Sequence, residues 1–433
     1  MASRPPPGPP VIPRPRVSSA PSAPCADATS GAAPANALTM TGSERRSSLS
    51  LASIYAMRML GLFLVLPVFA LEAPKYPGGD DPALVGLAMG IYGLTQGLLQ
   101  LPFGMASDRL GRKRVIVFGL LVFAAGSLLA ALASTLTMLI VGRCLQGAGA
   151  VSAVVTALLA DQTRDAVRTK AMALVGASIG LMFALSLVAA PVLAAWVGLA
   201  GLFGLTAFLA LSGVAITLWA VPPEPPRRAA PPRGSLRTVL THVPTLRLNV
   251  GVFVLHGVLL AMWVAVPQML VQAGLDKSHH WWVYLPTVAA SFFVMAGTLF
   301  PLERRGYLRA TFLGAIALVA LVQLGLAATA AAGPSLAALA FLLFAFFCGS
   351  NVLEACQPSI ASRAAPPEAR GAALGFYNTL QSLGFFAGGA LGGILIKSVG
   401  ATGLFLACGG ITLAWLALAW PMAAIGKPGE QAT

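Results

Sequence analysis

The stretch IYGLTQGLLQLPFGMASDRLGRKRVI, residues 91–116, passes from an apolar run through a short basic loop towards a second apolar run. The same alternation continues along the chain, in which 57% of the residues are hydrophobic and only 10% are charged. A water-soluble globular domain of 433 residues does not show this balance, so the fold has to be explained in lipid. The apolar runs are continuous, unlike the alternating strands of a membrane barrel, and therefore predict transmembrane helices.

A helix that crosses a bilayer needs about 20 mostly apolar residues. The hydropathy of the sequence predicts twelve such spans, which is an even number and puts both termini on one side of the membrane. They are expected at residues 50–71, 84–106, 114–133, 136–160, 169–195, 199–221, 249–272, 281–301, 308–332, 335–360, 370–396 and 401–424. The predicted fold class is an all-α membrane protein with twelve transmembrane helices in two pseudo-symmetric six-helix bundles, at residues 49–221 and 249–424.

The segments outside these bundles have a different composition. Residues 1–48 are rich in Pro, Ala, Ser and Arg, which predicts a disordered cytoplasmic tail. Residues 222–248 contain PPEPPRRAAPPRG and five arginines, which predicts a cytoplasmic linker between the bundles. Residues 425–433 are expected to form a second cytoplasmic tail.

The net charge of +14 is placed in short loops between the spans. Arginine and lysine concentrate in the loops at 109–114 and 304–309, so the positive-inside rule puts those loops and both termini in the cytoplasm. The charges form no basic face and no nucleic-acid module, so membrane lipid is an expected partner and nucleic acid is not.

The two bundles also repeat a motif. Residues 108–114 and residues 303–309 both read acid-Arg-x-Gly-x-x-Arg, each directly after the second span of its bundle. An internal duplication places matching sequences at matching positions, so this repeat predicts two similar halves.

The first of these loops is also the most specific motif. GMASDRLGRKRVI, residues 104–116, resembles the signature between helices 2 and 3 of the major facilitator superfamily, where it latches the two bundles together on the cytoplasmic side. The resemblance implies that Gly104 is a contact glycine, that Asp108 caps a helix of the other bundle, and that Arg112 pairs with an acid at the end of the fourth span, for which Asp161 fits. The expected latch comprises Gly104, Asp108, Arg109, Gly111, Arg112 and Asp161. The alternative is that these charges only set topology and solvate a loop.

Further motifs narrow the resemblance. RMLGLFLVLPVF in the first span, GRCLQGAGA in the fourth and NVLEA in the tenth look like the YajR-like branch of the proton-driven drug and sugar efflux facilitators. That branch implies export driven by protons across the cytoplasmic (inner) membrane of a bacterium. The fifth span departs from the Gly-Pro pair typical of antiporters and carries Ala190-Pro191, which leaves uptake by a symporter open.

Four ionisable side chains lie within the apolar spans, where such groups are costly and usually functional. Glu354 is expected to bind and release a proton, or alternatively to form a permanent ion pair with Arg58 or another cation. In the family, the arginine that Arg143 matches is linked to proton coupling; the alternative is a structural role at helix carbonyls. His256 titrates near neutrality if accessible, but a lone histidine is also a common packing residue. The proton-coupling candidates are therefore Glu354, Arg58, His256 and Arg143.

Amide side chains on the spans either line a substrate cavity or join helices to one another. The cavity candidates are Gln96, Gln146, Asn249, Asn351, Asn378 and Gln381. The glycine-rich run GFFAGGALGG, residues 384–393, lies within an apolar span and predicts a packing face rather than a phosphate-binding loop.

Together these patterns favour a secondary transporter that works by alternating access as a monomer. We expect proton-coupled export of a small amphipathic or apolar compound, powered by the proton gradient without a cofactor. No nucleophile with its base and no cluster of metal ligands is found in the spans, so neither a catalytic nor a metal site is predicted. The alternatives are a nutrient uptake symporter and a membrane sensor that does not transport.

Overall fold

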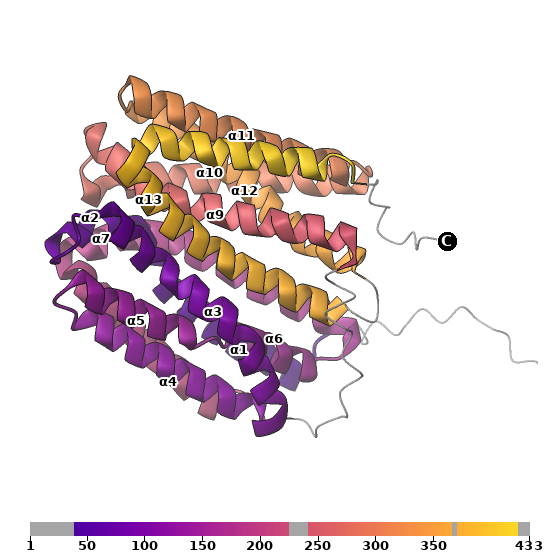
Figure 1. Cartoon of the computed structure of the whole chain (residues 1–433). Coiled ribbons are helices and arrows are strands. Elements are labelled where there is room, and N and C mark those ends of the chain that lie inside the picture. Colours follow the sequence, from indigo (N-terminus) through magenta and orange to yellow (C-terminus); the bar gives the residue numbers. More distant parts are fainter. Residues whose placement is uncertain (1–38, 225–240, 366–369, 423–433) are drawn as a thin grey trace, which may run out of the picture. The chain divides into compact units, whose positions relative to one another are not determined.

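The computed structural model describes residues 39–224, 241–365 and 370–422, and all of the regular structure in these ranges is helical. Its helices belong to one unit, Met40–Thr433 (Figure 1). The N-half contains α1 (Gly42–Phe63), α2 (Leu66–Glu72), the short η2 (Ala73–Lys75), α3 (Pro82–Leu110), α4 (Arg112–Ala131), α5 (Leu136–Ala148), α6 (Ser152–Asp161) and α7 (Asp165–Trp219). The C-half contains α9 (Val243–Gln272), the short η3 (Lys277–His279), α10 (Trp281–Arg304), α11 (Leu308–Ala332), α12 (Leu336–Ala364) and α13 (Arg370–Ala419).

Ten helical segments in the described residues are long and apolar enough to cross a membrane, and two of them are long enough to cross it twice. α7 has 55 residues and α13 has 50, whereas about 20 residues span a bilayer. Each is interrupted by one non-helical glycine, Gly198 with φ 64° and Gly400 with φ 70°. Glycine tolerates this left-handed backbone because it has no Cβ. The two long helices therefore supply two spans each, in agreement with the predicted twelve.

The two glycine corners share a sequence. Val197-Gly198-x-x-Gly201-Leu202-Phe203 joins the last two spans of the N-half, and residues 399–405 repeat it as Val-Gly-x-x-Gly-Leu-Phe in the C-half. In both corners a Cβ on the second glycine would meet the side chain of the valine four residues earlier. The repeat thus has a structural cause, since each corner needs the same two glycines, and it supports the predicted likeness of the halves.

Several boundaries differ from the predicted ones. α1 begins at Gly42, inside the predicted tail, because the side chains of Thr41 and Glu44 form a capping box. α9 begins at Val243, inside the predicted linker. The predicted tails at 1–38 and 425–433 and the centre of the linker, 225–240, lie outside the described residues.

Two predicted spans are broken rather than continuous. The first span separates into α1 and α2 at Leu64, with Pro67 in the first turn of α2. The fourth separates into α5 and α6 at residues 149–151, where a Cβ on Gly149 would press on the backbone of α4. Broken helices are common around the binding sites of transporters, because they leave polar groups available at membrane depth.

The glycine-rich run of α13 packs on two sides. Gly384 and Gly388 abut the backbone of α9 within the C-half, whereas Gly389 and Gly393 abut the backbone of α3 in the N-half. α13 therefore lies between α9 and α3 along much of its first span (Figure 1). The prediction of a packing face is confirmed, with the addition that this face serves both halves.

The two ends of the bundle are named here by their charge. The arginine-rich end carries the loop at 109–114 and the residues around Arg304 and Arg363. The arginine-poor end carries the connections at 73–81, 132–135, 273–280 and 333–335, which contain no arginine.

Candidate functional site

Arg58, in the second half of α1, is buried among neutral hydrogen-bonding partners. Its guanidinium donates to the Ser152 hydroxyl at 2.7 Å, to the Gln96 amide oxygen at 2.8 Å and to the Tyr92 hydroxyl. Ser152 is the first residue of α6, so the break in the fourth span provides one of these acceptors. Within the described residues, no carboxylate oxygen lies within 4.0 Å of a nitrogen of Arg58.

Arg143 is also fully buried, and its partners are mostly helix carbonyls. Its guanidinium lies 3.4 Å from the Ala88 oxygen and 3.3 Å from the Met89 oxygen, and it donates to the Gln146 amide oxygen at 3.0 Å. The guanidinium also lies over the Tyr92 ring, 5.1 Å from its centroid. These contacts are those of the structural alternative, and a part for Arg143 in proton coupling stays a prediction.

Glu354 and His256 form an ion-pair contact within the C-half. Glu354 Oε1 lies 2.8 Å from His256 Nε2; the histidine side chain is buried, whereas 39% of the glutamate side chain is exposed. His256 Nδ1 lies 2.8 Å from the Val252 carbonyl oxygen. Because a carbonyl can only accept, Nδ1 carries a proton, and Nε2 is the ring atom whose protonation can change.

This geometry revises the predicted partner of Glu354. The sequence suggested a proton-binding group or, alternatively, an ion pair with Arg58 or another cation; Arg58 lies in the N-half with neutral partners, and Glu354 contacts His256. The revision has a simple cause, because α9 and α12 pack against each other within the C-half. The order of residues along separate helices does not show which side chains meet.

Gln96 and Ser382 connect the halves near these groups. The Gln96 amide nitrogen on α3 donates to the Ser382 hydroxyl on α13 at 3.1 Å, while its oxygen accepts from Arg58. The preceding residue, Gln381, places its amide nitrogen 2.6 Å from His256 Nε2. Of these two consecutive residues of α13, Gln381 therefore contacts His256, and Ser382 is linked to Arg58 through Gln96.

The other amides separate into two groups. Asn351 and Asn378 are half-buried. The Asn351 side-chain amide donates to the Ser291 hydroxyl of α10 at 2.8 Å, and the backbone carbonyl of Asn378 accepts from the Ser382 hydroxyl. Gln146 and Asn249 are buried in this conformation, and a place for them in a substrate cavity stays a prediction. Gln146 instead joins α5 to α4 through Ser127 at 2.8 Å, which is the alternative use of such amides.

Three aromatic rings, from α1, α7 and α12, pack together where the two halves meet. Phe183 of α7 packs edge-on against Phe63 of α1, with 5.2 Å between centroids, and against Phe347 of α12 in the C-half at 6.2 Å. Such pairs combine a large apolar surface with a preferred geometry. The interface between the halves therefore combines these apolar contacts with the polar contacts described above.

Ion pairs join the halves at the arginine-poor end. The buried Glu72 carboxylate accepts from Lys277 of the C-half at 2.6 Å and from Lys75 of its own half. Asp81 accepts from Lys397 of α13 at 2.7 Å, and this hydrogen bond, together with the Ala83 backbone N–H, holds the pKa of Asp81 below its usual value.

At the arginine-rich end the described ion pairs stay within each half. Arg112 contacts Asp161 at 2.7 Å, as predicted, and Asp108 at 3.0 Å. In the C-half, Glu303 and Arg363 pair at 2.8 Å. In the N-half the start of the third span is thus linked to the end of the fourth, whereas in the C-half the end of the second span is linked to the end of the fourth.

The other predicted latch residues are placed as follows. Gly111 ends α3 and begins α4 with φ 106°, which explains the glycine at this position. A Cβ on Gly104 would meet no described heavy atom within 4 Å, so a contact of Gly104 with the other half stays a prediction. Arg109 is exposed and lies in the last turn of α3. The latch itself stays a prediction about another conformation.

Sequence reasoning missed several residues of these networks, among them Tyr92, Ser382, Glu72 and Lys277. Tyr92 and Ser382 are polar groups of a kind that is frequent in spans and gives no individual signal. Glu72 and Lys277 stand in the sequence only as loop charges. The sequence did offer one clue to a contact between Glu72 and Lys277, because they have opposite charges and are predicted on the same side of the membrane.

Comparison with known proteins identifies the family of this chain. Residues 51–389 match the family model described as Major Facilitator Superfamily. The inner membrane transport protein YajR of Escherichia coli K12 is 39% identical over 391 residues, which cover 89% of this chain and 85% of that protein. The multidrug resistance protein MdtH of Aeromonas salmonicida is 28% identical over 358 residues, covering 80% and 86% of the two chains.

Solved structures share the fold. The human organic anion transporter MFSD10 aligns with a TM-score of 0.65 and 18% identity, covering 88% of this chain and all of that one. A mutant of the nucleoside transporter NupG aligns with a TM-score of 0.70 and 12% identity, covering 86% and 99% of the chains. At these identities the likeness concerns the fold alone.

Proposed function

The chain belongs to the major facilitator superfamily of membrane transporters, and we propose that it exports a small amphipathic or apolar compound in exchange for protons. The observation that carries the proposal is the contact between Glu354 and His256, a titratable pair on membrane-spanning helices whose glutamate stays partly exposed. In the proposed orientation both termini and the arginine-rich end face the cytoplasm of a bacterium, and one chain completes the cycle as a monomer without a cofactor.

The pair has two proton states with different hydrogen bonds. When Nε2 of His256 carries a proton, it donates to the Glu354 carboxylate and forms an imidazolium–carboxylate pair. When Nε2 has lost its proton, it accepts from the Gln381 amide nitrogen, 2.6 Å away. Gain or loss of one proton therefore changes which neighbour forms a hydrogen bond with Nε2 of His256.

We place the coupling to conformation in the next residue of α13. Gln381 responds to His256, and Ser382 accepts the hydrogen bond from Gln96, whose oxygen is held by Arg58. A movement of α13 that reorients Gln381 also strains the Ser382–Gln96 bond between the halves. Proton binding in the C-half thereby alters a contact with the N-half, which alternating access requires.

Two observations support an amphipathic or apolar compound as the substrate. The rings of Phe63, Phe183 and Phe347 lie where the halves meet and offer apolar surface once the halves separate. The relatives MdtH and the class B tetracycline resistance protein of Escherichia coli are named for resistance to drugs; the latter is 33% identical over 141 residues. The cavity lining then combines these rings with Gln96, Asn351, Asn378 and Gln381.

The test replaces Glu354 by Gln in purified protein reconstituted in proteoliposomes. With ethidium and other amphipathic dyes as probes, an imposed pH gradient should drive dye exchange in the wild type and none in Glu354→Gln. Glu303→Gln is the matched control, because Glu303 pairs with Arg363 at the arginine-rich end of the same half. Unchanged pH-driven exchange in Glu354→Gln would remove this residue from the mechanism.

The direction of transport needs a separate measurement. Inverted vesicles with an acidified interior should accumulate dye if the protein exchanges substrate for protons. Accumulation that instead requires an acidic exterior identifies an uptake symporter. A wild type that moves no dye under either gradient contradicts the proposed substrate class.

A further inference from the structure

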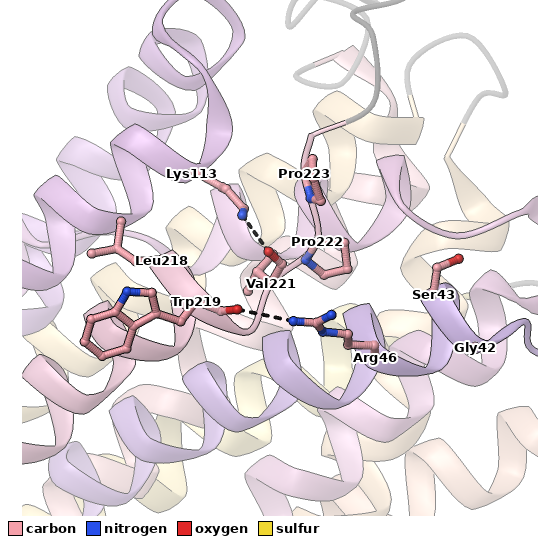
Figure 2. A pocket seen from close by; sticks show the side chains of 9 residues that line it. All are labelled: Gly42, Ser43, Arg46, Lys113, Leu218, Trp219, Val221, Pro222 and Pro223. Carbon is pink, nitrogen blue, oxygen red and sulfur yellow. Dashed lines mark hydrogen bonds between the residues drawn. The ribbon is translucent and has the colours of Figure 1, made fainter.

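A surface pocket lies at the arginine-rich end of the N-half, away from the groups discussed above. It has a volume of about 550 Å³ and is formed by the start of α1, the start of α4 and the end of α7 (Figure 2). Its lining includes Ser43, Arg46, Lys113, Leu218 and Trp219. Two cations thus line the pocket, and no carboxylate among the described residues does.

Both cations are fixed in place by backbone carbonyls. Arg46 donates to the Ala220 oxygen at 2.9 Å and to the Trp219 oxygen at 3.2 Å, and Lys113 Nζ donates to the Val221 oxygen at 2.6 Å. Figure 2 shows the two side chains reaching the end of α7 from different helices. Neither has a carboxylate oxygen within 4.0 Å among the described residues, although the Glu224 carboxylate acts electrostatically on Lys113 from a greater distance.

The nearest acids have other partners. Glu224 accepts from the backbone N–H groups of Arg112 and Lys113 at 3.2 and 2.7 Å. Glu44 is occupied by the Arg164 side chain at 2.8 Å. The first turn of α1 also borders the pocket, and its N–H groups and helix dipole add to the positive potential there.

The pocket has an apolar side that faces outward. Trp219 is 79% exposed and Leu218 is 56% exposed at the last turn of α7. Tryptophan is enriched where membrane proteins cross from hydrocarbon to headgroups, because its ring is apolar and its N–H is polar. The pocket therefore joins a cationic cavity to a surface suited to an acyl chain.

We propose that this pocket binds the headgroup of an anionic phospholipid. Arg46, Lys113 and Ser43 contact the phosphodiester, while the acyl chains lie along Leu218 and Trp219. Because no acidic side chain of the described residues lines the pocket, it offers nothing to the ammonium group of a zwitterionic lipid. With the arginine-rich end in the cytoplasm, the bound lipid belongs to the inner leaflet, and the pocket anchors the end of α7 at that surface.

Charge also argues against the chain's own neighbouring segments as occupants. Residues 1–38 and 225–240 contain seven arginines and a single acid, Asp27. Segments of the same sign as the pocket are repelled from it, and near a membrane they reinforce the attraction of anionic lipid.

The test compares lipid binding by native mass spectrometry of the purified protein in detergent. Phosphatidylglycerol should bind the wild type more tightly than phosphatidylcholine with the same chains. The double variant Arg46→Gln/Lys113→Gln should bind phosphatidylglycerol roughly thirtyfold more weakly, since each basic residue near an anionic surface contributes about 1 kcal/mol. The matched control is Arg45→Gln/Arg114→Gln, which removes two exposed charges adjacent in sequence that do not line the pocket.

A second variant separates binding from folding. Ser43→Glu places a negative charge in the pocket within the first turn of α1, where an acidic residue favours the helix. It should lose phosphatidylglycerol without a lower unfolding temperature, and Arg46→Lys/Lys113→Arg should retain the lipid. An equal loss of binding in the control pair, equal binding of both lipids, or displacement of the lipid by inorganic phosphate would each overturn the proposal.

Discussion

The two ends of α3 differ in what they touch. Near the arginine-poor end a Cβ on Gly90 would lie 2.7 Å from the Phe386 oxygen of α13, and one on Gly97 would lie 3.3 Å from the Thr379 oxygen. At Gly104 no described atom lies within 4 Å of that position. From Gly86 to Gly104 is about 27 Å along a helix, so α3 leaves α13 progressively over that length.

The ion pairs follow the same division. At the arginine-poor end Glu72 and Asp81 accept from lysines of the other half, whereas the described pairs at the arginine-rich end remain within a half. The described ion pairs between the halves thus concentrate at the arginine-poor end, which is called the closed end below; the other end is called the free end, since no described ion pair joins the halves there. In the proposed orientation and cycle, this arrangement corresponds to an inward-facing form.

The largest expected effect comes from overpacking the closed end. In Gly389→Leu the new Cβ would lie 2.6 Å from the Gly86 oxygen, so α3 and α13 must separate at a cost of about 3 kcal/mol, roughly a hundredfold in the conformational ratio. Pulsed EPR between spin labels at the exposed Leu84 and Val399 should report a longer distance in most molecules. Gly410→Leu is the control on the same helix, because a Cβ on Gly410 would meet nothing within 4 Å.

A leucine at the free end should favour this conformation, whereas the leucine at the closed end disfavours it. Gly104→Leu fits this conformation and replaces a poor helix former, so the unfolding temperature should not fall. If Gly104 contacts the C-half when the arginine-rich end closes, transport should drop about tenfold while the Leu84–Val399 distance stays short. Wild-type transport in this variant would show that Gly104 makes no close contact in any step.

Removing one charge at the closed end should have a smaller effect. Glu72→Gln breaks the ionic contacts with Lys277 and Lys75, and we expect about a fivefold increase in the separated population, equivalent to about 1 kcal/mol. The EPR distribution measures that population. Lys75→Met is the matched control, since it keeps the pair with Lys277 between the halves. An equal effect of both variants would argue that the contact between halves contributes nothing.

The smallest effect should be that of acid on the Asp81–Lys397 pair. Lys397 lowers the pKa of Asp81, so the pair is complete above the ordinary carboxyl pKa of about 4 and is lost as the pH falls through the lowered value. The separated EPR population should therefore rise slightly only at the most acidic pH. Lys397→Met should remove that pH-dependent increment, whereas an increment that survives has to come from another group.

Much of this division was predictable from the sequence. Hydropathy and loop charge predicted the helices, the two halves and the basic end, because lipid imposes the same requirement on every span. The repeated acid-Arg-x-Gly-x-x-Arg loops predicted matching positions, and the Arg112–Asp161 pair is present. The glycine run of α13 predicted close packing, although not that it faces two helices.

The site was less predictable, because side-chain partners depend on how each helix is rotated about its axis. Gln96 and Gln146 have the same side chain, yet one links the halves and the other is buried within the N-half. Glu354 contacts His256 rather than Arg58 for the same reason. The break at Gly149 also gave no clear signal, since glycine is frequent in membrane helices that do not break.

Arg58 and Arg143 add two positive charges to the interior of the N-half, with no carboxylate within 4.0 Å among the described residues. An elementary charge that crosses the whole membrane potential changes its free energy by about 2.3 kcal/mol per 100 mV. Rocking of the N-half carries both guanidinium groups through part of that field. In the proposed cycle, the membrane potential therefore shifts the equilibrium between the two conformations.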